Sequence, residues 1–465
     1  MKRLTSLLSA SLAAAGIAGV YFSGKRFIFN QGKNSMAAKN YRYVILGGGV
    51  SAGYAARAFV EKGLGKGELA IVSDEGVAPY ERPALSKGFL IGNPPARLPG
   101  FHTCVGSGGE RLPPEWYQEH GIDLLLSNAV TSVDPSTKTL KLSSGDTISY
   151  DKLVVATGCS AMKFSDLGFP GADYQGIHYL RNIHDAEKLY DAIQAQKGKE
   201  AVVIGGGYIG MEVAAALAQN QVSCTMVFPE AHMMERLFTP EIAKFYEDFY
   251  QKKGVKILKG LSCKSFVGND KGHVTGVVLT DGSELKTELV VVGIGAKPNT
   301  KLLEPFLKME QRGFLVNAQL QTSDSNIFAV GDVATFPLKM YENRLERVEH
   351  VGNARQMATH AVDVIFGSQE AYDYLPFFYS RVFDKSWKFY GDNPKDATCL
   401  LFGEMNPKLF AVWIKPNHQV VGTFTESATP EEEKKIERIA RERPVVDVEK
   451  LKACRSADEA LNFFS

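Results

Sequence analysis

The sequence predicts an α/β fold, with two similar strand–turn–helix domains followed by a C-terminal α+β domain. Three observations predict it. An apolar run at 43–46 leads into a glycine-rich turn at 47–53, and a second run at 201–204 leads into a similar turn at 205–210. From Arg42 onward, short apolar runs alternate with helical stretches, which is typical of a doubly wound parallel sheet.

Each glycine-rich turn has the features of a Rossmann-like dinucleotide site. A pyrophosphate needs a tight turn, a backbone without a Cβ in the way and the amide end of a helix. Gly47-Gly48-Gly49 and Gly205-Gly206-Gly207 provide all three. Two such turns in one chain predict two bound dinucleotides and electron transfer between them.

Composition limits the other possibilities. At 465 residues the chain exceeds what one hydrophobic core usually serves, so two or three domains are expected. Lys and Arg (53) nearly balance Asp and Glu (52), which favours a small-molecule substrate over a nucleic-acid partner. The six cysteines contain no Cys-x-x-Cys or Cys-x-x-x-x-Cys pair, so they predict neither a metal site nor a redox disulfide.

The N-terminal segment at 1–39 is predicted to be a targeting presequence or a membrane anchor. The first 42 residues carry seven Lys and Arg but no Asp or Glu, and residues 4–22 are almost uncharged. An organellar presequence, for a chloroplast or a mitochondrion, is favoured because Ser and Ala dilute the apolar stretch. A second start at Met36 would give a cytoplasmic form, and membrane attachment is expected only through this segment.

The first domain is expected to begin with a strand at 42–46, a helix at about 53–62 and a strand at 69–72. Asp74 and Glu75 directly follow that second strand. An acidic residue at this position accepts hydrogen bonds from a ribose, and we expect Glu75 to do so.

The second domain repeats the pattern. Its strand at 225–228 ends at Pro229-Glu230. A carboxylate at this position accepts from a 2′-hydroxyl and repels a 2′-phosphate, so Glu230 favours NADH over NADPH. The nearby Arg236 leaves NADPH as a less preferred donor.

The first domain is predicted to be split. A buried strand at 153–158 and a strand ending in Gly331-Asp332 both have small residues at their ends, where Asp332 can approach the ribityl chain of FAD closely. The predicted domains are an FAD-binding domain at 40–165 and 297–335, an NAD-binding domain at 166–296 and a C-terminal domain at 336–465.

With these strand ends in order, the chain resembles the pyridine nucleotide:flavin disulfide oxidoreductases of the glutathione reductase superfamily, although it lacks their cysteine pair. Four segments resemble plant monodehydroascorbate reductases more specifically. They are residues 78–87 (APYERPALSK), 99–106 (PGFHTCVG), 347–351 (RVEHV) and 372–381 (YDYLPFFYSR). The resemblance extends from about residue 40 to the last predicted helix.

This resemblance implies FAD as cofactor, NADH as donor and the monodehydroascorbate radical as acceptor, and it matches Arg355 and Tyr379 to the catalytic positions that bind the radical. The implied FAD-binding residues are Gly47, Gly48, Gly49, Val50, Ser51, Ala52, Glu75, Arg82, Lys87, Val130, Arg181, Asn182, Asp332, Glu349 and His350. The implied NAD-binding residues are Gly205, Gly206, Gly207, Tyr208, Ile209, Gly210, Met211, Glu230, Arg236 and Gly295. His102 and Cys104 are further candidates for the acceptor side.

The chain departs from the family at two places near the implied site. Family members usually have Asp-His where this chain has Gly352-Asn353, so the support of Arg355 is expected to differ. Asn182 replaces an acidic residue that is common after Arg181.

Two other functions fit the same fold. An NADH-dependent ferredoxin or rubredoxin reductase also lacks the cysteine pair, but it needs a basic docking face for its acidic partner. A flavoprotein of the apoptosis-inducing-factor type would need a strongly basic patch, and residues 40–465 contain no long Lys/Arg run.

Overall fold

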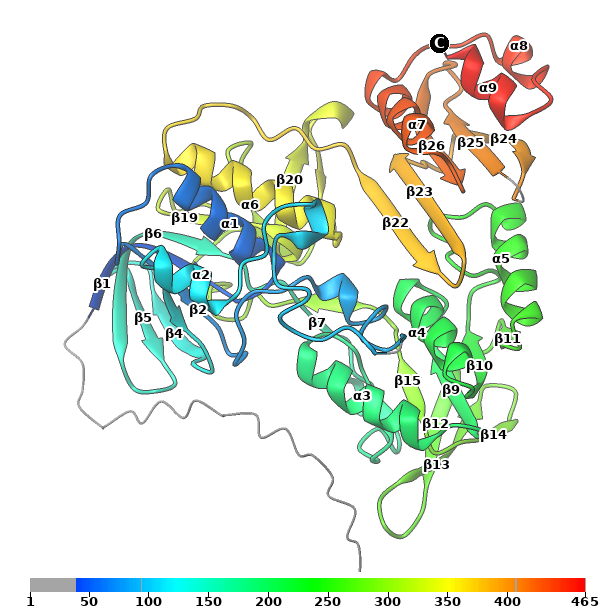
Figure 1. Ribbon diagram of the computed structural model, residues 1–465, viewed down its shortest axis with the longest axis horizontal. Coiled ribbons are helices and arrows are strands. Elements are labelled where there is room, and N and C mark those ends of the chain that lie inside the picture. Colours follow the sequence, from blue (N-terminus) through cyan, green and yellow to red (C-terminus); the bar gives the residue numbers. More distant parts are fainter. Residues whose placement is uncertain (1–38, 93, 406–407, 465) are drawn as a thin grey trace, which may run out of the picture. The chain divides into compact units, whose positions relative to one another are not determined.

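The computed structural model describes residues 39–92, 94–405 and 408–464 (Figure 1). The predicted targeting segment, apart from Lys39, and the alternative start at Met36 lie outside these residues. Within the described ranges, no helix combines the length and the hydropathy that crossing a membrane requires.

The first large sheet has seven strands in the order β3-β2-β1-β6-β5-β4, with β19 pairing with β6. The pairs β1/β2, β1/β6, β2/β3 and β6/β19 are parallel, whereas β4/β5 and β5/β6 are antiparallel. The strands span Lys39–Leu46 (β1), Leu69–Val72 (β2), Asp123–Leu125 (β3), Val130–Asp134 (β4), Thr139–Leu142 (β5), Thr147–Val155 (β6) and Ile327–Ala329 (β19).

Two helices cover this sheet next to the first glycine turn. Helices α1 (Val50–Glu61) and α6 (Val351–Ile365) pack against each other. Helix α1 begins three residues before the expected position, because Gly49 already serves as its N-cap. Strand β1 likewise begins three residues early, at Lys39.

The second large sheet is entirely parallel, in the order β11-β10-β9-β15-β8. Its strands span Ile177–His178 (β8), Glu200–Ile204 (β9), Ser223–Phe228 (β10), Lys256–Lys259 (β11) and Val290–Val292 (β15). Its helices are α3 (Ile183–Ala195), α4 (Tyr208–Gln219) and α5 (Pro240–Lys252). The predicted pair of dinucleotide-binding units is thus confirmed as a doubly wound α/β fold.

Smaller elements complete the two units. Three small sheets contain β12 (Cys263–Gly268), β13 (Val274–Leu279) and β14 (Glu284–Lys286); β7 (Cys159–Ala161) and β16 (Ala296–Pro298); and β17 (Met309–Glu310), β18 (Gly313–Leu315), β20 (Ala334–Leu338) and β21 (Arg344–Glu346). Helix α2 spans Pro114–Glu119, and short 3-10 helices span Arg82–Ala84, Val105–Ser107, Ser165–Leu167, Gly331–Val333 and Lys339–Tyr341.

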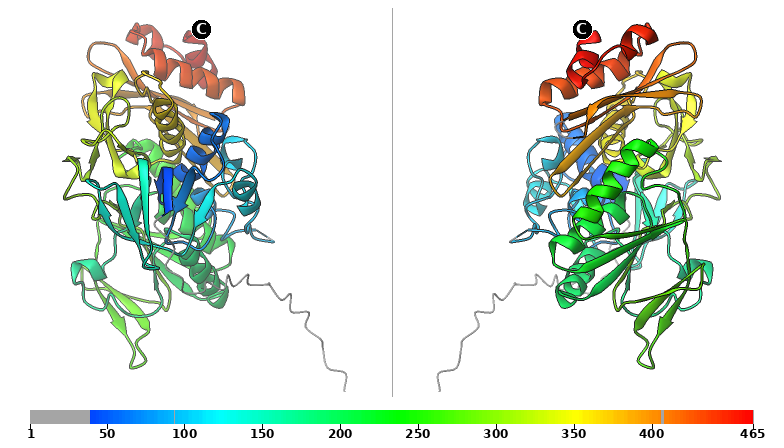
Figure 2. Two further views of the ribbon diagram at one scale, coloured as in Figure 1. Left: turned by 90° about the vertical axis from the view of Figure 1, so that its left-hand side faces the viewer. Right: turned by 90° about the vertical axis from the view of Figure 1, so that its right-hand side faces the viewer.

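The C-terminal sheet is antiparallel, in the order β22-β23-β26-β25-β24. Its strands span Phe377–Val382 (β22), Lys385–Gly391 (β23), Thr398–Glu404 (β24), Lys408–Ile414 (β25) and Val420–Glu426 (β26). Helices α7 (Pro430–Glu442), α8 (Val448–Lys452) and α9 (Ala457–Phe463) gather on one side of it (Figures 1 and 2). This confirms the α+β expectation for the third part, while the exact domain boundaries stay a prediction.

An aromatic cluster joins the second sheet's helices to the C-terminal sheet. Trp387 on β23 is fully buried, and its ring centroid lies 5.2 Å from that of Phe238 and 5.7 Å from that of Tyr208. Trp387 also stacks on Phe424 of β26, with ring centroids 5.9 Å apart. Its indole Nε1 has no hydrogen-bond partner among the described residues.

We expect Trp387→Ala to destabilise the fold by about 3–5 kcal/mol, because it leaves a large cavity where two sheets meet. Trp387→Phe keeps an aromatic ring and removes the unpaired N–H, so its cost is expected to be smaller. Urea unfolding of both variants measures the difference. Equal losses of stability in the two would contradict the packing role of the indole ring.

Candidate active site

Both glycine-rich turns line one cavity of about 1180 Å³. It is larger than the about 300–1,000 Å³ typical of a small-molecule site. The carboxyl ends of β1, β2 and β9, the residues directly after β10 and the first residues of α1, α4 and α6 contribute to its lining. This is the edge at which doubly wound sheets bind their ligands.

The first turn leaves space for a phosphate. Gly47 has φ +120°, and a Cβ there would lie 2.3 Å from the carbonyl oxygen of Ala156. Gly49 is the N-cap of α1, and a Cβ on it would meet nothing closer than Arg82 at 3.5 Å. The amide end of α1 therefore faces the cavity with no side chain in the way.

The second turn repeats this geometry. Gly205 also has φ +120°, and a Cβ there would lie 2.3 Å from the carbonyl oxygen of Gly293. Gly207 is the N-cap of α4, and a Cβ on it would meet no heavy atom within 4 Å among the described residues. Both turns thus fit the pyrophosphate of a dinucleotide.

Not every residue of the two motifs faces the cavity. The ones that line it are Gly47, Gly48, Gly49, Val50, Ser51, Gly205, Gly206, Gly207, Tyr208 and Ile209. Ala52 and Met211 are buried in the core instead. Gly210 allows a close approach, because a Cβ there would lie 2.0 Å from the carbonyl oxygen of Gly205.

The residues implied for FAD binding beyond the turn all line the cavity: Glu75, Arg82, Lys87, Val130, Arg181, Asn182, Asp332, Glu349 and His350. Four of them are linked. Arg82 forms an ion pair with Glu75 and donates to the Arg181 carbonyl oxygen at 2.9 Å. Arg181 in turn donates to Asp332 Oδ2 at 2.8 Å. Their individual roles toward FAD stay a proposal.

Asn182 has a local structural task. It is the N-cap of α3, and its side chain accepts a hydrogen bond from the Asp185 backbone N–H at 2.9 Å. Asp185 completes the capping box by accepting from the Asn182 backbone N–H at 3.2 Å. The amide therefore starts a helix at the cavity wall without adding a charge.

The residues implied for NAD binding beyond the second turn, Glu230, Arg236 and Gly295, also line the cavity. Glu230 and Arg236 are exposed, and both follow β10. Gly295 has φ +115°, so it allows a turn after β15 that other residues rarely adopt.

A buried carboxylate that the motif analysis did not assign to the site joins three parts of the chain. Glu212 lies one turn inside α4 with a 5% exposed side chain, and it forms an ion pair with Lys87 at 2.7 Å. It also accepts hydrogen bonds from Ser86 and, at 2.6 Å, from Ser380 of β22. An acid just inside the helix after the second glycine turn was the signal that could have identified it.

His350 lies between the start of α6 and the aromatic residues of β22. Its Nδ1 accepts the Gly352 backbone N–H at 3.2 Å as the N-cap of α6. Burial lowers the pKa of His350 to about 3, helped by the positive charges of Arg355 and Lys87. The ring is therefore neutral with its proton on Nε2, and its centroid lies 5.3 Å from Phe378 and 5.5 Å from Tyr379.

The two residues implied for the acceptor lie in different environments. Tyr379 lines the cavity. Arg355 does not; its guanidinium donates to Glu81 Oε2 at 2.7 Å and its carbon lies 5.5 Å from the centre of the Tyr54 ring. Burial alone would lower the pKa of Arg355, but the Glu81 carboxylate more than offsets it and the pKa is raised.

His102 and Cys104 are buried and do not line the cavity. Burial raises the pKa of the Cys104 thiol to about 12, so it is protonated at neutral pH. These two side chains therefore do not present reactive groups to the cavity.

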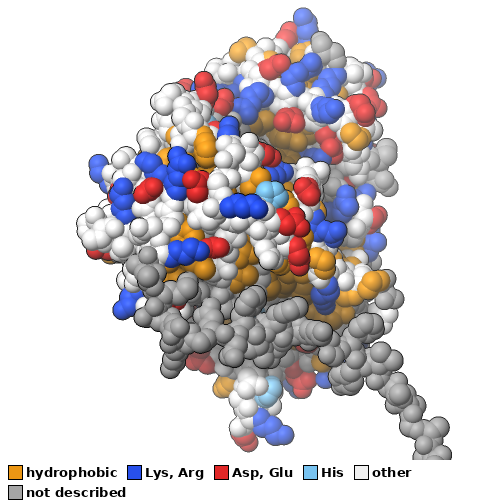
Figure 3. Space-filling view, turned by 60° about the vertical axis from the view of Figure 1, so that its left-hand side comes forward, with side chains coloured by type: hydrophobic (Ala, Val, Ile, Leu, Met, Phe, Trp, Pro, Cys, Tyr) orange, Lys and Arg blue, Asp and Glu red, His pale blue; other side chains and the backbone are white. Residues whose placement is uncertain are grey.

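On the face shown in Figure 3, basic and acidic side chains are interspersed. Among the described residues, no group of three or more His, Cys, Asp and Glu side chains is arranged to hold a metal ion.

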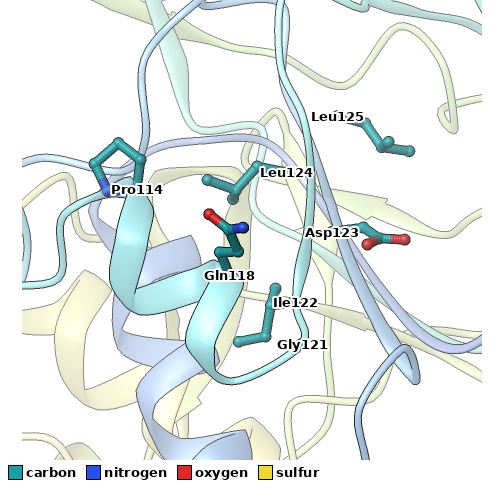
Figure 4. Close-up of a pocket in the computed structure, with 7 residues that line it drawn as sticks. All are labelled: Pro114, Gln118, Gly121, Ile122, Asp123, Leu124 and Leu125. Carbon is teal, nitrogen blue, oxygen red and sulfur yellow. The ribbon is translucent and has the colours of Figure 1, made fainter.

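A second, smaller cavity of about 280 Å³ lies between α2 and β3 (Figure 4). It is lined by Pro114, Gln118, Gly121, Ile122, Asp123, Leu124 and Leu125. Its one carboxylate, Asp123, already accepts the Tyr41 hydroxyl at 2.6 Å. None of the site residues implied by the sequence lies there.

Comparison with known proteins agrees with this geometry. A family model described as pyridine nucleotide-disulphide oxidoreductase matches residues 41–358, and one described as the C-terminal domain of monodehydroascorbate reductase 3-like proteins matches residues 375–462. The peroxisomal monodehydroascorbate reductase 4 of Arabidopsis thaliana is 53% identical over 411 residues, which are 88% of this chain and 83% of the relative. The monodehydroascorbate reductase of Pisum sativum is 50% identical over 437 residues, covering 92% and 99% of the two chains.

Among solved structures, putidaredoxin reductase in its covalent complex with putidaredoxin superposes with a TM-score of 0.81 at 28% identity, over 92% of this chain and 98% of that one. The predicted oxidoreductase with FAD and NAD(H) as cofactors is confirmed by these matches. The chain belongs to the pyridine nucleotide-disulphide oxidoreductase family and, within it, to the monodehydroascorbate reductases.

Proposed function

We propose that this protein oxidises NADH and reduces the monodehydroascorbate radical to ascorbate, with FAD between donor and acceptor. One observation carries the proposal. A single cavity is lined by Gly47, Gly205 and Tyr379, so two dinucleotides and an acceptor meet in one place. The relatives at about half identity bear the name of this activity.

Bound FAD supplies the step between a hydride donor and a one-electron acceptor. The chain itself needs no thiol for this reaction. Its six cysteines are free, and burial raises the pKa of Cys104 and Cys159, the two nearest in sequence to the implied flavin segments. The residues of the site therefore bind and orient the cofactors and the acceptor, and they stabilise charge.

Helix α6 and Lys87 provide positive potential at the cavity. Val351 and Ala354, in the first turn of α6, line it, and the amide end of a helix carries about half a positive charge. The Lys87 ammonium is held by Glu212 at 2.7 Å. We propose that both stabilise negative charge on the flavin ring.

Arg355 and Tyr379 are proposed to bind the acceptor. The radical is an anion near neutral pH, and a guanidinium offers several donors to its oxygens. Tyr379 is half-buried at the cavity wall, where its ring can stack on the acceptor.

A reductase of an iron–sulfur protein remains the second candidate, because the chain superposes on putidaredoxin reductase. An acidic iron–sulfur partner would require a basic docking face on this protein. On the face shown in Figure 3, basic and acidic side chains are interspersed instead. NADH oxidation measured with the radical, with a ferredoxin and without acceptor separates the two functions.

Relatives carry peroxisomal, cytosolic and chloroplastic names. We propose that residues 1–39 direct this chain to an organelle. A fluorescent fusion of the full chain is expected in an organelle, and a fusion starting at Met36 in the cytoplasm. Identical distributions of the two fusions would contradict the targeting role.

Substitutions in the two glycine turns are expected to affect different cofactors. Gly47→Ala should lose bound FAD, because its Cβ would collide with a carbonyl and its φ would be strained by about 1–3 kcal/mol. Gly205→Ala should keep FAD but raise the KM for NADH about tenfold or more. Absorbance near the flavin maximum and steady-state kinetics measure the two effects.

Gly254→Ala is the matched control for these variants. Gly254 has φ +88°, but a Cβ there would meet no heavy atom within 4 Å among the described residues. The Gly254→Ala substitution should lower the free energy of unfolding but leave the FAD content and the KM for NADH unchanged. Loss of FAD from Gly205→Ala together with retention in Gly47→Ala would reverse the assignment of the two turns.

Arg355→Ala is expected to raise the KM for the radical by about 10–100-fold, the equivalent of about 1.5–3 kcal/mol for hydrogen bonds to a charged group. The KM for NADH should change by less than about twofold. Arg455→Ala, which removes an exposed arginine that does not line the cavity, serves as the control. Equal rises of both KM values in Arg355→Ala would remove its proposed role.

A further inference from the structure

A buried ion pair lies beside the cavity. Arg355 donates to Glu81 Oε2 at 2.7 Å, and the two side chains are 15% and 5% exposed. Glu81 comes just before the 3-10 helix Arg82–Ala84, whereas Arg355 lies in α6, so the contact joins segments 274 residues apart. Breaking such a pair leaves an uncompensated charge in the interior.

The second oxygen of Glu81 is also fully engaged. Oε1 accepts the Tyr54 hydroxyl at 2.9 Å and the Gly106 backbone N–H at 3.0 Å. Three donors, from α1, the 3-10 helix Val105–Ser107 and α6, therefore converge on one carboxylate. Charge-assisted hydrogen bonds of this kind fix both the position and the direction of the carboxylate.

The chain leaves room for this pair at Gly106. A Cβ on Gly106 would lie 2.1 Å from the Arg355 terminal nitrogen and 2.6 Å from the Glu81 carboxyl carbon. Neither atom can move away freely, because each is held by the other. A side chain at position 106 would therefore displace the guanidinium.

The pair holds Arg355 without using all of its donors. A guanidinium has five N–H donors, and the Nε of Arg355 has no hydrogen-bond partner among the described residues. Burial raises the pKa of the Tyr379 phenol on the cavity wall, and the positive charge of Arg355 partly opposes this rise.

We propose that Glu81 is a positioning residue for the electron acceptor: it holds the Arg355 guanidinium in the orientation that binds the acceptor anion next to Tyr379. This inference rests on the proposed function. A long arginine side chain that is already ordered loses less entropy when the acceptor binds. Glu81 itself is outside the cavity lining and acts only through Arg355.

The first test is Glu81→Gln, assayed for NADH oxidation with enzymatically generated monodehydroascorbate and, separately, with ferricyanide. The KM for the radical should rise about tenfold, because the guanidinium is no longer held in place. The KM for NADH, the FAD content and the ferricyanide rate should stay within twofold of the wild type. Glu81→Asp, which keeps the charge, should recover part of the lost affinity for the radical.

Glu426→Gln is the matched control. Glu426 is a buried carboxylate that accepts a tyrosine hydroxyl, from Tyr246, and a backbone N–H, from Ser386 at 3.2 Å, and it forms no ion pair with an arginine among the described residues. Its variant should leave the KM for the radical unchanged. If Glu426→Gln raised that KM as much as Glu81→Gln, the effect would be one of general packing and the proposal would fail.

A double variant tests whether Glu81 acts through Arg355. In an Arg355→Ala background, Glu81→Gln should have no further effect on the KM for the radical. An additive effect, or a Glu81→Gln variant with an unchanged or lower KM, would overturn the proposal. If Glu81→Gln does not fold, Gly106→Ala displaces the guanidinium with both charges kept, and it must then raise the same KM.

The wild-type enzyme separates this inference from the proposed function. If it reduces ferricyanide but not monodehydroascorbate, the proposed function fails before any variant is compared. If it reduces both and Glu81→Gln changes neither KM, only the role of Glu81 is lost.

Discussion

The site depends on two backbone turns that exclude a Cβ. Gly47 and Gly205 share φ +120°, and a Cβ on either would lie 2.3 Å from a carbonyl oxygen of the neighbouring strand end. Because each turn is packed against the parallel strands of its own sheet, α1 and α4 begin directly at the cavity with their amide ends exposed to it. The same local constraint, applied twice, produces a cavity that suits two dinucleotides.

Charged side chains join the parts that surround this cavity. Glu212 of α4 contacts Lys87, in the segment between β2 and β3, and Ser380 of the C-terminal sheet, so one buried carboxylate joins three separate segments of the chain. Arg181 and Asp332 form a second link, between segments 151 residues apart. Ion pairs that are wholly or partly buried contribute little net stability, but removing one partner is costly, so they favour one arrangement of the parts.

The acceptor side shows why a shared fold does not give a shared substrate. Putidaredoxin reductase superposes over most of this chain at 28% identity, whereas the monodehydroascorbate reductases match it at about half identity. The residues proposed to select the acceptor, Arg355 and Tyr379, lie on α6 and β22, outside both glycine turns. On this proposal, the acceptor is selected by a few side chains placed on a common framework.

The sequence by itself determined the fold class, the two glycine turns and the acids at the strand ends, because each is encoded within a few consecutive residues. It did not determine which motif residues face the cavity: Ala52 and Met211 are in the core because helical periodicity and packing turn them inward. The Glu81–Arg355 pair and the contacts of Glu212 also needed the tertiary structure, since their partners lie 125 to 274 residues apart. Local backbone chemistry can be read along the chain, but contacts across such distances exist only after the sheets have packed.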